Sequence, residues 1–577
     1  MYSLKLLRII FASLFFVAIS VFFVDFTSGV PRALHGLAHL QLTPTILIGT
    51  FGVLGAGVFV FWFVTTLLFG RVYCSVICPF GILQDIVSWI AKHVTKKKKY
   101  KYQKETTHIR YSFLILFVFG LCFLPVIVSI LDPYSNYGRV MNSLARPVVI
   151  YGNNLIAGFT ASWEKPLAYN VAISFDFGAF LTAAAAFVIV GVFSFFFGRR
   201  YCNTICPVGT LLGLVSRFSF VKVRLLHNCR SCGLCERVCK SECINSKAKT
   251  VDTSRCVACM NCLSQCRSNA ISLSYQPHHK QPPLFQPKDG LPGTSPKQHT
   301  HEPHQNPAFE PLSLLPGAIP IPVPVNGTVQ QTANRTTEVG TQRRRFVKWS
   351  IFTFLAALFA KKTVTAAEDA IVDESLPHGE SRVSYTMNTP VLPPGAKNVE
   401  RFRKRCTACH LCVTKCPTGI ITPSTTELGL AGFLQPILKF RRGFCDYECK
   451  ICTEVCPSLA LTPLETLMDK KVVQMGRVVF LKENCVVNTQ GTNCGACAEH
   501  CPTGAVAMVP YGEPEKALTI PVTKPELCIG CGGCEFICPV RPYRAIYVEG
   551  LEVHQTAELG YDPNAKQEEV KVDDFGF

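Results

Sequence analysis

Residues 229–266 read CRSCGLCERVCKSECINSKAKTVDTSRCVACMNCLSQC and contain two cysteine runs of the same spacing. In each run, three cysteines recur at every third position and a fourth follows four residues later. Three thiolates in such a tight loop, with a fourth supplied by the neighbouring run, are the ligands of a cubane [4Fe–4S] cluster. The segment therefore predicts two clusters, with the ligand sets Cys229, Cys232, Cys235 and Cys266, and Cys256, Cys259, Cys262 and Cys239.

A structural zinc site is the alternative interpretation of these Cys-x2-Cys pairs. Zinc needs only four thiolates, however, and the triplet spacing would then have no explanation. Lys240 and Arg267 follow Cys239 and Cys266 at positions where proline is usual, which weakens the loop geometry but keeps the ligands. Cys243 is left over, and it is either an alternative ligand or a packed thiol.

The C-terminal part of the chain contains four more runs, each ending in Cys-Pro. The first gap is three residues in the second of these runs and eight residues in the third. Short apolar segments after the Cys-Pro pairs are typical of the strand and helix units of bacterial ferredoxins. The runs predict four further clusters, which makes six in the chain, but the spacing does not assign the fourth cysteines to clusters. The expected ligands are Cys406, Cys409, Cys412, Cys416, Cys445, Cys449, Cys452, Cys456, Cys485, Cys494, Cys497, Cys501, Cys528, Cys531, Cys534 and Cys538.

The composition indicates that part of the chain lies in a lipid bilayer. Hydrophobic residues make up 48% of the 577 residues and charged residues only 17%, whereas soluble proteins carry about 25% charged residues. The net charge of +19 is typical of basic cytoplasmic loops in membrane proteins, so we expect no nucleic-acid partner. The 30 cysteines are too many for a catalytic thiol, and their spacing does not fit a secreted disulfide scaffold.

Four apolar stretches approach or reach the length of about 20 residues that a bilayer requires. They cover residues 9–24, 46–69, 111–130 and 177–197. The first could alternatively be the apolar core of a signal peptide, but no small-residue cleavage site follows it. Lysine and arginine gather before the first stretch and between the second and third, which places these flanks in the cytoplasm. After the fourth stretch the chain is again cytoplasmic.

An internal repeat follows the second and fourth apolar stretches. Residues 70–81 read GRVYCSVICPFG and residues 198–209 read GRRYCNTICPVG, with eight of twelve positions identical. Because both repeats stand at cytoplasmic helix ends, they bring two thiol pairs to one membrane face. We expect these four thiols to bind one redox or metal cofactor, and the alternative is that the sulfurs are merely packed. The four residues are Cys74, Cys78, Cys202 and Cys206.

Residues 276–341 are rich in Pro, Gln, Thr, Gly and His without an apolar period, which indicates a flexible linker. Residues 342–366 contain Arg343, Arg344 and Arg345 before an apolar stretch and look like an internal twin-arginine export signal. A short amphipathic or buried helix with basic flanks is the alternative. Export would place the C-terminal cluster domain in the periplasm.

These features predict a membrane α-helical fold with four transmembrane helices, plus α+β bacterial-ferredoxin-like [4Fe–4S] domains. No nucleotide, flavin or molybdenum-cofactor motif is present, so we expect the chain to conduct electrons rather than to transform a substrate. The expected parts are a four-helix membrane domain at 1–220, a two-cluster ferredoxin domain at 221–275, the linker at 276–341, the signal-like helix at 342–366 and a four-cluster polyferredoxin domain at 367–577.

Residues 1–275, with four apolar stretches, two Gly-Arg-x-Tyr-Cys-x3-Cys-Pro repeats and two clusters, resemble the NapH type of membrane ferredoxin. Residues 342–577, with twin arginines and first gaps of three and eight residues, resemble NapG, so the chain looks like a fusion of the two. The resemblance implies a quinol dehydrogenase component, multi-pass in the bacterial inner (cytoplasmic) membrane. It would pass electrons from quinol through six clusters to a periplasmic reductase, such as nitrate reductase. Its implied partners are the quinone pool and this terminal reductase or its electron carrier.

Two other functions stay open at this point. The four-helix, two-cluster part also resembles assembly or regulatory ferredoxins for copper oxidases or nitrous oxide reductase, although those lack a four-cluster tail. A cytoplasmic-facing iron–sulfur relay would result if the segment at Arg343 neither exports nor spans. A quinol site needs a cleft near a membrane interface and a group that takes up protons. The candidates, which are alternatively ordinary interfacial residues, are His35, His39, Asp25, Gln84 and Asp85.

Overall fold

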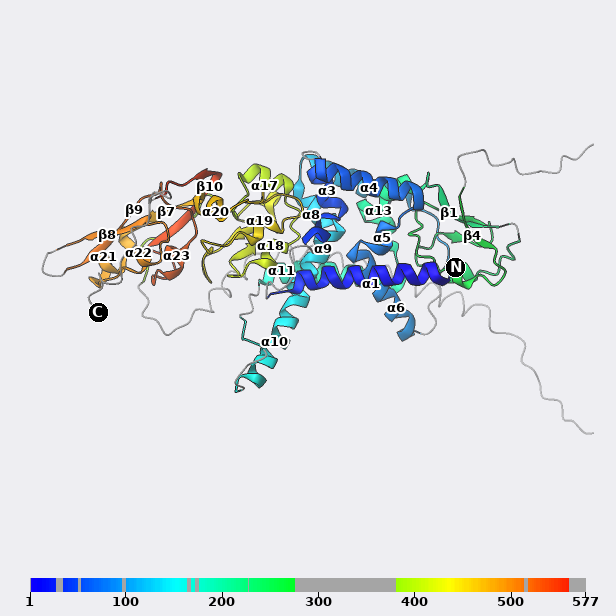
Figure 1. Ribbon diagram of the computed structural model, residues 1–577, viewed down its shortest axis with the longest axis horizontal. Coiled ribbons are helices and arrows are strands. Elements are labelled where there is room, and N and C mark those ends of the chain that lie inside the picture. Colours follow the sequence, from blue (N-terminus) through cyan, green and yellow to red (C-terminus); the bar gives the residue numbers. More distant parts are fainter. Residues whose placement is uncertain are drawn as a thin grey trace, which may run out of the picture. The chain divides into compact units, whose positions relative to one another are not determined.

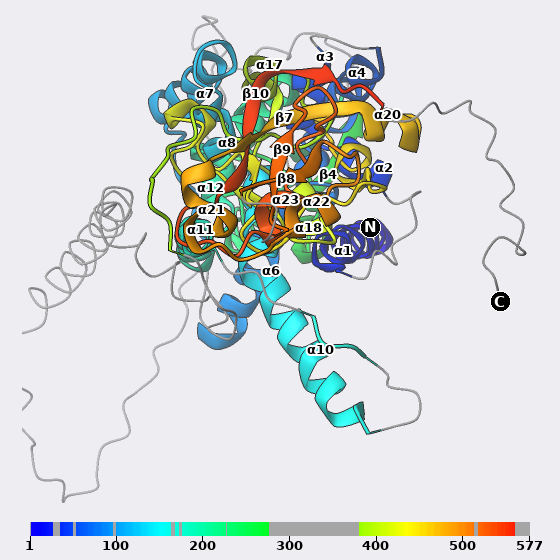
Figure 2. The same cartoon turned by 90° about the vertical axis from the view of Figure 1, so that its left-hand side faces the viewer.

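The protein is described by a computed structural model over residues 2–26, 35–49, 53–95, 100–162, 168–171, 176–226, 228–275, 380–512 and 517–559. The predicted linker at 276–341 and the twin-arginine segment at 342–366 lie outside these residues. The described residues belong to one compact unit, which Figures 1 and 2 show from two sides.

The N-terminal part of the chain is helical. Its helices are α1 (Tyr2–Val24), α2 (Gly36–His39), α3 (Leu42–Gly49), α4 (Val53–Phe69), α5 (Tyr73–Val76), α6 (Pro79–Thr95), α7 (Thr107–Cys122), α8 (Pro125–Leu131), α9 (Pro133–Val140), α10 (Arg146–Thr160), α11 (Phe177–Phe197), α12 (Arg200–Thr204) and α13 (Pro207–Ser216), with a π-helical turn at Met141–Ala145. Among the described residues, two helical segments, Leu4–Val24 and Phe177–Phe197, are long and apolar enough to cross a bilayer. Helices of this length and composition thus occur at two of the four predicted stretches, and the set of four spanning helices stays a prediction.

Residues 46–69 do not form the single helix that the sequence predicted. Instead α3 and α4 pack against each other as a helical hairpin. Trp62 Nε1 in α4 donates a hydrogen bond to the carbonyl of Leu40, 2.9 Å away and just before α3. The amide of Leu42 donates to the hydroxyl of Tyr73 at 3.2 Å, beyond the C-terminal end of α4. The start of α3 thus lies against the second half of α4.

Glycine and proline explain where the predicted helices are divided. Gly49 is the last residue of α3, and a glycine in a helix interior costs about 1 kcal/mol relative to alanine. The predicted helix over 111–130 is interrupted between α7 and α8, where Leu124 has φ −134° and ψ 81°. The ring of Pro125 disfavours the α conformation of the residue before it and supplies no amide hydrogen to a helix.

Helix α11 has the bounds that the sequence predicted for the fourth stretch. The side chain of Asp176 caps its first turn by accepting a hydrogen bond from the amide of Ala179 at 2.8 Å. Gly198 ends the helix with φ +68°, and a Cβ at this position would lie 2.7 Å from the carbonyl oxygen of Lys240. The second repeat therefore begins where the helix meets the first cluster segment.

The segment with the first two cysteine runs consists of two small antiparallel sheets and two short helical turns. The sheets pair β1 (Val221–Leu225) with β4 (Ile271–Tyr275), and β2 (Ile244–Asn245) with β3 (Thr250–Val251). The turns are α14 (Leu234–Arg237) and a 3-10 turn at Leu263–Gln265. Both cysteine runs surround one apolar core that includes Val223 and Ile271.

The C-terminal part consists of ferredoxin-like units around a larger core, in which Leu392, Phe402 and Val548 are completely buried. Three antiparallel sheets pair β5 (Ile421–Pro423) with β6 (Pro436–Leu438), β7 (Val473–Phe480) with β10 (Ile546–Thr556), and β8 (Val506–Pro510) with β9 (Thr519–Thr523). The helices are α17 (Val399–Arg405), α18 (Leu411–Lys415), α19 (Ile451–Glu454), α20 (Leu467–Val472), α21 (Val486–Gln490), α22 (Ala496–Glu499) and α23 (Gly533–Ile537). The α+β character expected from the apolar segments after the Cys-Pro pairs is thus present.

Helix α1 connects the two cysteine-rich parts. Near its N-terminal end, Lys5 Nζ donates a hydrogen bond to Ser264 Oγ at 3.4 Å, within the second cysteine run. Beyond its C-terminal end, Asp25 Oδ2 lies 2.5 Å from Nζ of Lys415 in α18. The helix has 23 residues, which corresponds to about 35 Å. The two cysteine-rich parts therefore contact opposite ends of one bilayer-length helix (Figure 1).

Replacing Lys415 by alanine should loosen the C-terminal part from α1. The side chains of Lys415 and Asp25 are only 3% and 8% exposed, and removing one partner of a buried pair costs about 3–5 kcal/mol. Hydrogen–deuterium exchange should rise in α18 and in the last turn of α1.

The matched control is Lys404→Ala, which breaks a pair with Glu400 whose side chains are 62% and 79% exposed. A pair this exposed contributes little to stability, so exchange in α18 should stay at the wild-type rate. If the Lys415 variant exchanged no faster than this control, the contact would not hold the two parts together.

Candidate iron–sulfur sites and thiol tetrad

The third and fourth runs of the C-terminal part share their cysteines. Cys485, Cys494 and Cys497 of the third run line one apolar cavity with Cys538, the last cysteine of the fourth run. The cavity has a volume of about 350 Å³, including its opening to solvent. Burial raises the pKa of Cys497 to about 12, and the nearby thiolates of Cys494, Cys538 and Cys485 contribute. Three thiols from one run and one from the next thus form a group.

The complementary group contains the remaining cysteines of these two runs. Burial raises the pKa of Cys534 well above its usual value, and the thiolates of Cys531, Cys528 and Cys501 raise it further. Cys501 closes the third run but lies with the triplet of the fourth. The exchange of fourth cysteines is the arrangement found in two-cluster ferredoxins.

The first and second runs of the C-terminal part exchange cysteines in the same way. Burial raises the pKa of Cys412, and among the neighbouring thiolates are those of Cys406 and Cys409 from its own run and of Cys456 from the next. In the other group, Cys452 is affected first by burial and then by Cys445, Cys416 and Cys449. The structure therefore divides the sixteen cysteines of the C-terminal part into four groups of four. The spacing alone had left this assignment open.

In the first cluster segment, one predicted ligand set lines a cavity of about 340 Å³. Its members are Cys239, Cys256, Cys259 and Cys262, and Cys243 lines the same cavity. In the other set, burial raises the pKa of Cys235 to about 11, with the thiolates of Cys229 and Cys232 nearby. The sulfur of Cys266, the fourth predicted member, accepts a hydrogen bond from the amide of Ala270 at 3.2 Å.

The cysteine groups provide the thiolates that a cubane [4Fe–4S] cluster uses as ligands. Among the residues that the structure describes, no three His, Cys, Asp or Glu side chains converge closely enough to hold a single ion. A cubane has four separate iron corners and needs a cavity lined by four thiols, as in the two cavities described. The raised thiol pKa values mean that iron must displace protons when it binds.

The two repeats bring their four cysteines together, and we call this group the thiol tetrad. Its members are Cys74, Cys78, Cys202 and Cys206, each at most 4% exposed. They share one hydrophobic cluster with Tyr73, Tyr201 and Phe80. Cys78 interacts electrostatically with Cys74 and Cys202, and Cys206 interacts with the other three thiols. The expected meeting of the two pairs is thus what the structure describes.

The arginine of each repeat forms hydrogen bonds with the other repeat. Arg71 of the first repeat donates hydrogen bonds to Asn203 Oδ1 at 2.8 Å and to the carbonyl of Cys202 at 3.2 Å. Arg199 of the second repeat donates to the carbonyl of Cys74 at 2.5 Å. The two arginines, at equivalent repeat positions, therefore cross to the opposite repeat and join the halves of the tetrad.

A glycine in each repeat makes room for this crossing. A Cβ on Gly81 would lie 2.5 Å from the carbonyl oxygen of Cys74 and 2.8 Å from Arg199 Nη1. A Cβ on Gly209 would lie 2.7 Å from Arg71 Nη2 and would also overlap the carbonyl of Cys202. The last glycine of each repeat is thus explained by a close approach of the backbone and the crossing guanidinium.

Two side chains donate hydrogen bonds directly to tetrad sulfurs. Gln84 Nε2 lies 3.2 Å from Cys202 Sγ, and Arg71 Nη2 lies 3.8 Å from Cys74 Sγ. The sequence predicted neither contact. It made Gln84 a candidate residue of the quinol site and Arg71 only a part of the repeat. Donors to sulfur are among the features that set the potential of a thiolate-bound redox centre.

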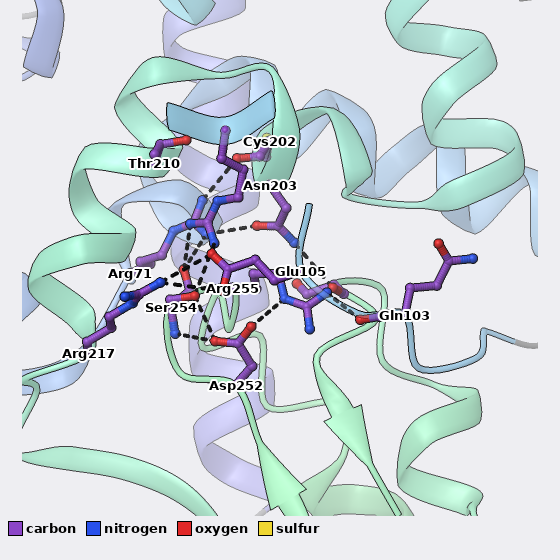
Figure 3. Close-up of polar contacts among 12 residues, drawn as sticks. Arg71, Gln103, Glu105, Cys202, Asn203, Thr210, Arg217, Asp252, Ser254 and Arg255 are labelled. Atoms are coloured by element: carbon purple, nitrogen blue, oxygen red, sulfur yellow. Dashed lines mark hydrogen bonds and ion pairs between the residues drawn. The ribbon is translucent and has the colours of Figure 1, made fainter. Parts of the chain in front are cut away.

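A buried polar network joins the tetrad to the first cluster segment (Figure 3). Arg71 Nη1 donates to the carbonyl of Ser254 at 3.0 Å, two residues before Cys256. Arg255, next in the chain, pairs with Asp252 and donates to the carbonyl of Gln103 at 2.8 Å. Figure 3 shows these contacts converging between the repeats and the loop that leads into the second cysteine run.

Lys240 provides a second connection between the first cluster segment and the repeats. Its carbonyl accepts a hydrogen bond from the amide of Arg199 at 2.9 Å, and its Nζ lies 3.4 Å from Asp85 Oδ1. Proline, which is usual at this position, could not form this ion pair. Lys240 thus attaches the loop after Cys239 to the second repeat.

The tetrad also packs toward the C-terminal cysteines. Cys409 and Val455 belong to the same hydrophobic cluster as the tetrad, and so do Tyr134 and Tyr137 of α9. A Cβ on Gly138 of α9 would overlap the carbonyl of Cys409. Since Cys259 of the first cluster segment packs against this cluster as well, the cluster that contains the tetrad reaches cysteines of both cluster-rich parts.

The structure gives the five quinol candidates other contacts. Asp25 pairs with Lys415, and Gln84 contacts Cys202. Asp85 is surrounded by Arg8, Arg199 and Lys240. The ring of His35 lies 5.0 Å from that of Phe22, and His39 forms a hydrogen bond with the backbone of Pro457. Each candidate thus takes part in packing or in contacts between parts of the chain.

Comparison with known protein families finds iron–sulfur domains along the chain. A family described as "4Fe-4S binding domain" matches residues 51–98 and 179–225, which contain the two repeats. A "4Fe-4S dicluster domain" matches residues 490–541, and another "4Fe-4S binding domain" matches residues 399–422. No solved structure matches the chain significantly.

Three curated relatives show how far the similarity extends. The methylamine utilization ferredoxin-type protein MauM of Methylobacillus flagellatus is 33% identical over 159 residues, 26% of this chain and 64% of the relative. An uncharacterized protein of Methanocaldococcus jannaschii is 27% identical over 281 residues, 48% of this chain and 89% of the relative. The chain thus spans just under two thirds of the length of this MauM protein.

The third relative is the ferredoxin-type protein NapG of Escherichia coli strain K12. It is 33% identical over 181 residues, which are 29% of this chain and 74% of the relative. Four-cysteine groups, [4Fe–4S] domain matches and this coverage agree with one another. The chain therefore belongs to the NapG family of ferredoxin-type proteins and is an iron–sulfur electron-transfer protein.

Proposed function

We propose that this protein is a membrane electron conduit that takes electrons from quinol and delivers them to a periplasmic redox enzyme. The observation that carries the proposal is the position of the two cysteine-rich parts, which contact opposite ends of α1 through Ser264 and Lys415. The hydrophobic cluster that contains the thiol tetrad also includes Cys409 and packs against Cys259, which belong to the two parts. A protein with electron carriers at both ends of a bilayer-length helix is suited to moving electrons across a membrane.

Six [4Fe–4S] clusters are assigned to the six groups of cysteines. Two are held by the predicted sets in the first cluster segment, and four by the exchanged groups of the tail. When bound, each cluster supplies a one-electron redox centre whose potential depends on exposure and on hydrogen bonds to sulfur. The tail sets are Cys406, Cys409, Cys412 and Cys456; Cys445, Cys449, Cys452 and Cys416; Cys485, Cys494, Cys497 and Cys538; and Cys528, Cys531, Cys534 and Cys501.

The thiol tetrad is assigned a redox or metal cofactor of its own. Its four buried sulfurs, the donors Gln84 and Arg71, and the family described as "4Fe-4S binding domain" that covers both repeats support this assignment. Arg71 and Arg199 hold the two thiol pairs at a fixed separation by bonding to the opposite repeat. Their positive charge would offset the negative charge of metal-bound thiolates.

The orientation follows from charge and from the predicted export signal. Lys5 and Arg8 at the start of α1 favour the cytoplasm for this end. The first cluster segment, which contacts this end, would then be cytoplasmic, and the tail at the other end periplasmic. Residues 1–275 serve as the NapH-like membrane component in a multi-pass inner-membrane protein, and the quinol donor and the reductase acceptor come from that resemblance.

The acceptor class is wider than nitrate reductase. The chain is similar both to NapG and to MauM, a protein named for methylamine utilization. We therefore assign the acceptor only as a periplasmic redox enzyme or its electron carrier. An assembly ferredoxin would not need clusters at both ends of the helix, and a cytoplasmic relay would not need export of the tail.

Changing any one tetrad cysteine to serine should lower quinol-dependent reduction of the clusters about 10-fold or more, because serine is a poor soft-metal ligand. The iron of the six proposed cubanes should stay near its wild-type value, about 24 atoms per chain. The measurement is the rate of visible bleaching after a menaquinol analogue is added to membranes, alongside iron analysis.

The control for this series is Cys122→Ser, since Cys122 is exposed on α7 and belongs to none of the groups. It should reduce at the wild-type rate. Wild-type rates in all four tetrad variants would instead assign these sulfurs to packing and require another electron entry site.

Replacing Arg343, Arg344 and Arg345 together by lysine should retain the tail in the cytoplasm, because the export receptor recognises the arginine pair rather than charge alone. A β-lactamase reporter fused after Phe577 should then lose its activity outside the cytoplasm, and ampicillin resistance should fall. A fusion after Tyr275, which ends before the three arginines, is the control and should give no resistance. Unchanged resistance with the lysine variant would contradict export through this segment.

A further inference from the structure

Cys243 lies with the ligands of one cluster site although the cysteine count does not require it. Its side chain is 1% exposed, and it lines the same cavity as Cys239, Cys256, Cys259 and Cys262. Its sulfur is 3.5 Å from that of Cys239 and forms a hydrogen bond with the thiol of Cys256. Five thiols therefore surround a site where a cubane has four iron corners.

The backbone fixes this fifth thiol in place. Glu242 adopts φ +54°, which turns the chain back after Cys239, and Ile244 then enters β2. The carbonyl of Cys243 accepts a hydrogen bond from the amide of Asp252 at 2.9 Å. The thiol thus stands beside Cys239 because of a turn and a strand pair.

Cys243 stands four positions after the last cysteine of its run, and the other cysteine runs show which residue is usual there. In four of them the residue four positions after the last cysteine is apolar and at most 1% exposed, and it follows a residue with positive φ. The residues at these positions are Ala270, Ile420, Ala460 and Ala505. An alanine side chain is therefore enough to fill the space at this position, and packing does not require the sulfur of Cys243.

We propose that Cys243 is a reserve ligand for the cluster that Cys239, Cys256, Cys259 and Cys262 hold, an inference that rests on the proposed function. In the exchange, the bond between one iron and Cys239 Sγ breaks, and a bond between the same iron and Cys243 Sγ forms. The proton of the Cys243 thiol moves to the Cys239 sulfur across their 3.5 Å contact. The number of thiolates and of electrons on the cluster does not change, so no oxidant is required.

The exchange would keep an iron corner coordinated when its first thiolate dissociates. This cluster site lies next to the tetrad, since Arg71 contacts the Ser254 carbonyl just before Cys256. Loss of one iron here would interrupt the connection between the first cluster segment and the tetrad. The sister site, with Cys266, has Ala270 at the corresponding position and no fifth thiol there.

The test compares alanine variants of the full-length protein, purified without oxygen. Cys239→Ala should retain wild-type iron, because Cys243 takes over the iron corner. The double variant with Cys239→Ala and Cys243→Ala should lose at least one iron per chain and show the electron paramagnetic resonance signal of an oxidised [3Fe–4S] cluster. Cys266→Ala, at the sister site without a reserve thiol, should show this signal as a single variant.

Cys243→Ala alone should fold and contain wild-type iron, since alanine occupies the equivalent position of three other runs. On exposure to air it should lose iron faster than the wild type. The inference would be overturned if Cys239→Ala lost as much iron as the double variant, or if Cys243→Ala lost iron in air no faster than the wild type. A wild-type protein with far less than about 24 iron atoms would instead contradict the proposed set of six cubanes.

Discussion

The buried carboxylate of Asp85 is the interaction on which the arrangement of the N-terminal half depends. Its oxygens lie 2.6 Å from Arg8 in α1, 2.8 Å from Arg199 at the second repeat and 3.4 Å from Lys240 in the first cluster segment. Helix α1, the second repeat and the first cluster segment therefore all contact the same carboxylate. Arg199 is fully buried, and a buried charge that loses its partner destabilises a protein by about 3–5 kcal/mol.

The crossing arginines extend this constraint to the tetrad. Arg199 binds both Asp85 and the carbonyl of Cys74, so the charge cluster and the thiols are positioned by the same side chain. Arg71 makes the corresponding link to Cys202 and to the loop before the second cysteine run. Cluster segment, tetrad and α1 are thereby held as one assembly, which is what an electron path with fixed distances needs.

The spacing of the cysteines predicted the cluster segments and the internal repeat predicted the meeting of the two thiol pairs, because both depend on local sequence. The grouping of Cys538 with the third run required the tertiary structure, since several exchanges satisfy the same spacing. The contact between Asp25 and Lys415 joins residues 390 positions apart and has no local signal. The break at Pro125 did have a local signal, which the apolar period of the stretch outweighed.

The central claim is that electrons cross the membrane within this single chain. Its most direct test uses the purified protein in sealed liposomes with ferricyanide trapped inside, dithionite outside and an uncoupler to release the charge. The account predicts reduction of the trapped ferricyanide at a rate proportional to the protein content. A rate equal to that of protein-free liposomes, with the clusters intact, would contradict a transmembrane path.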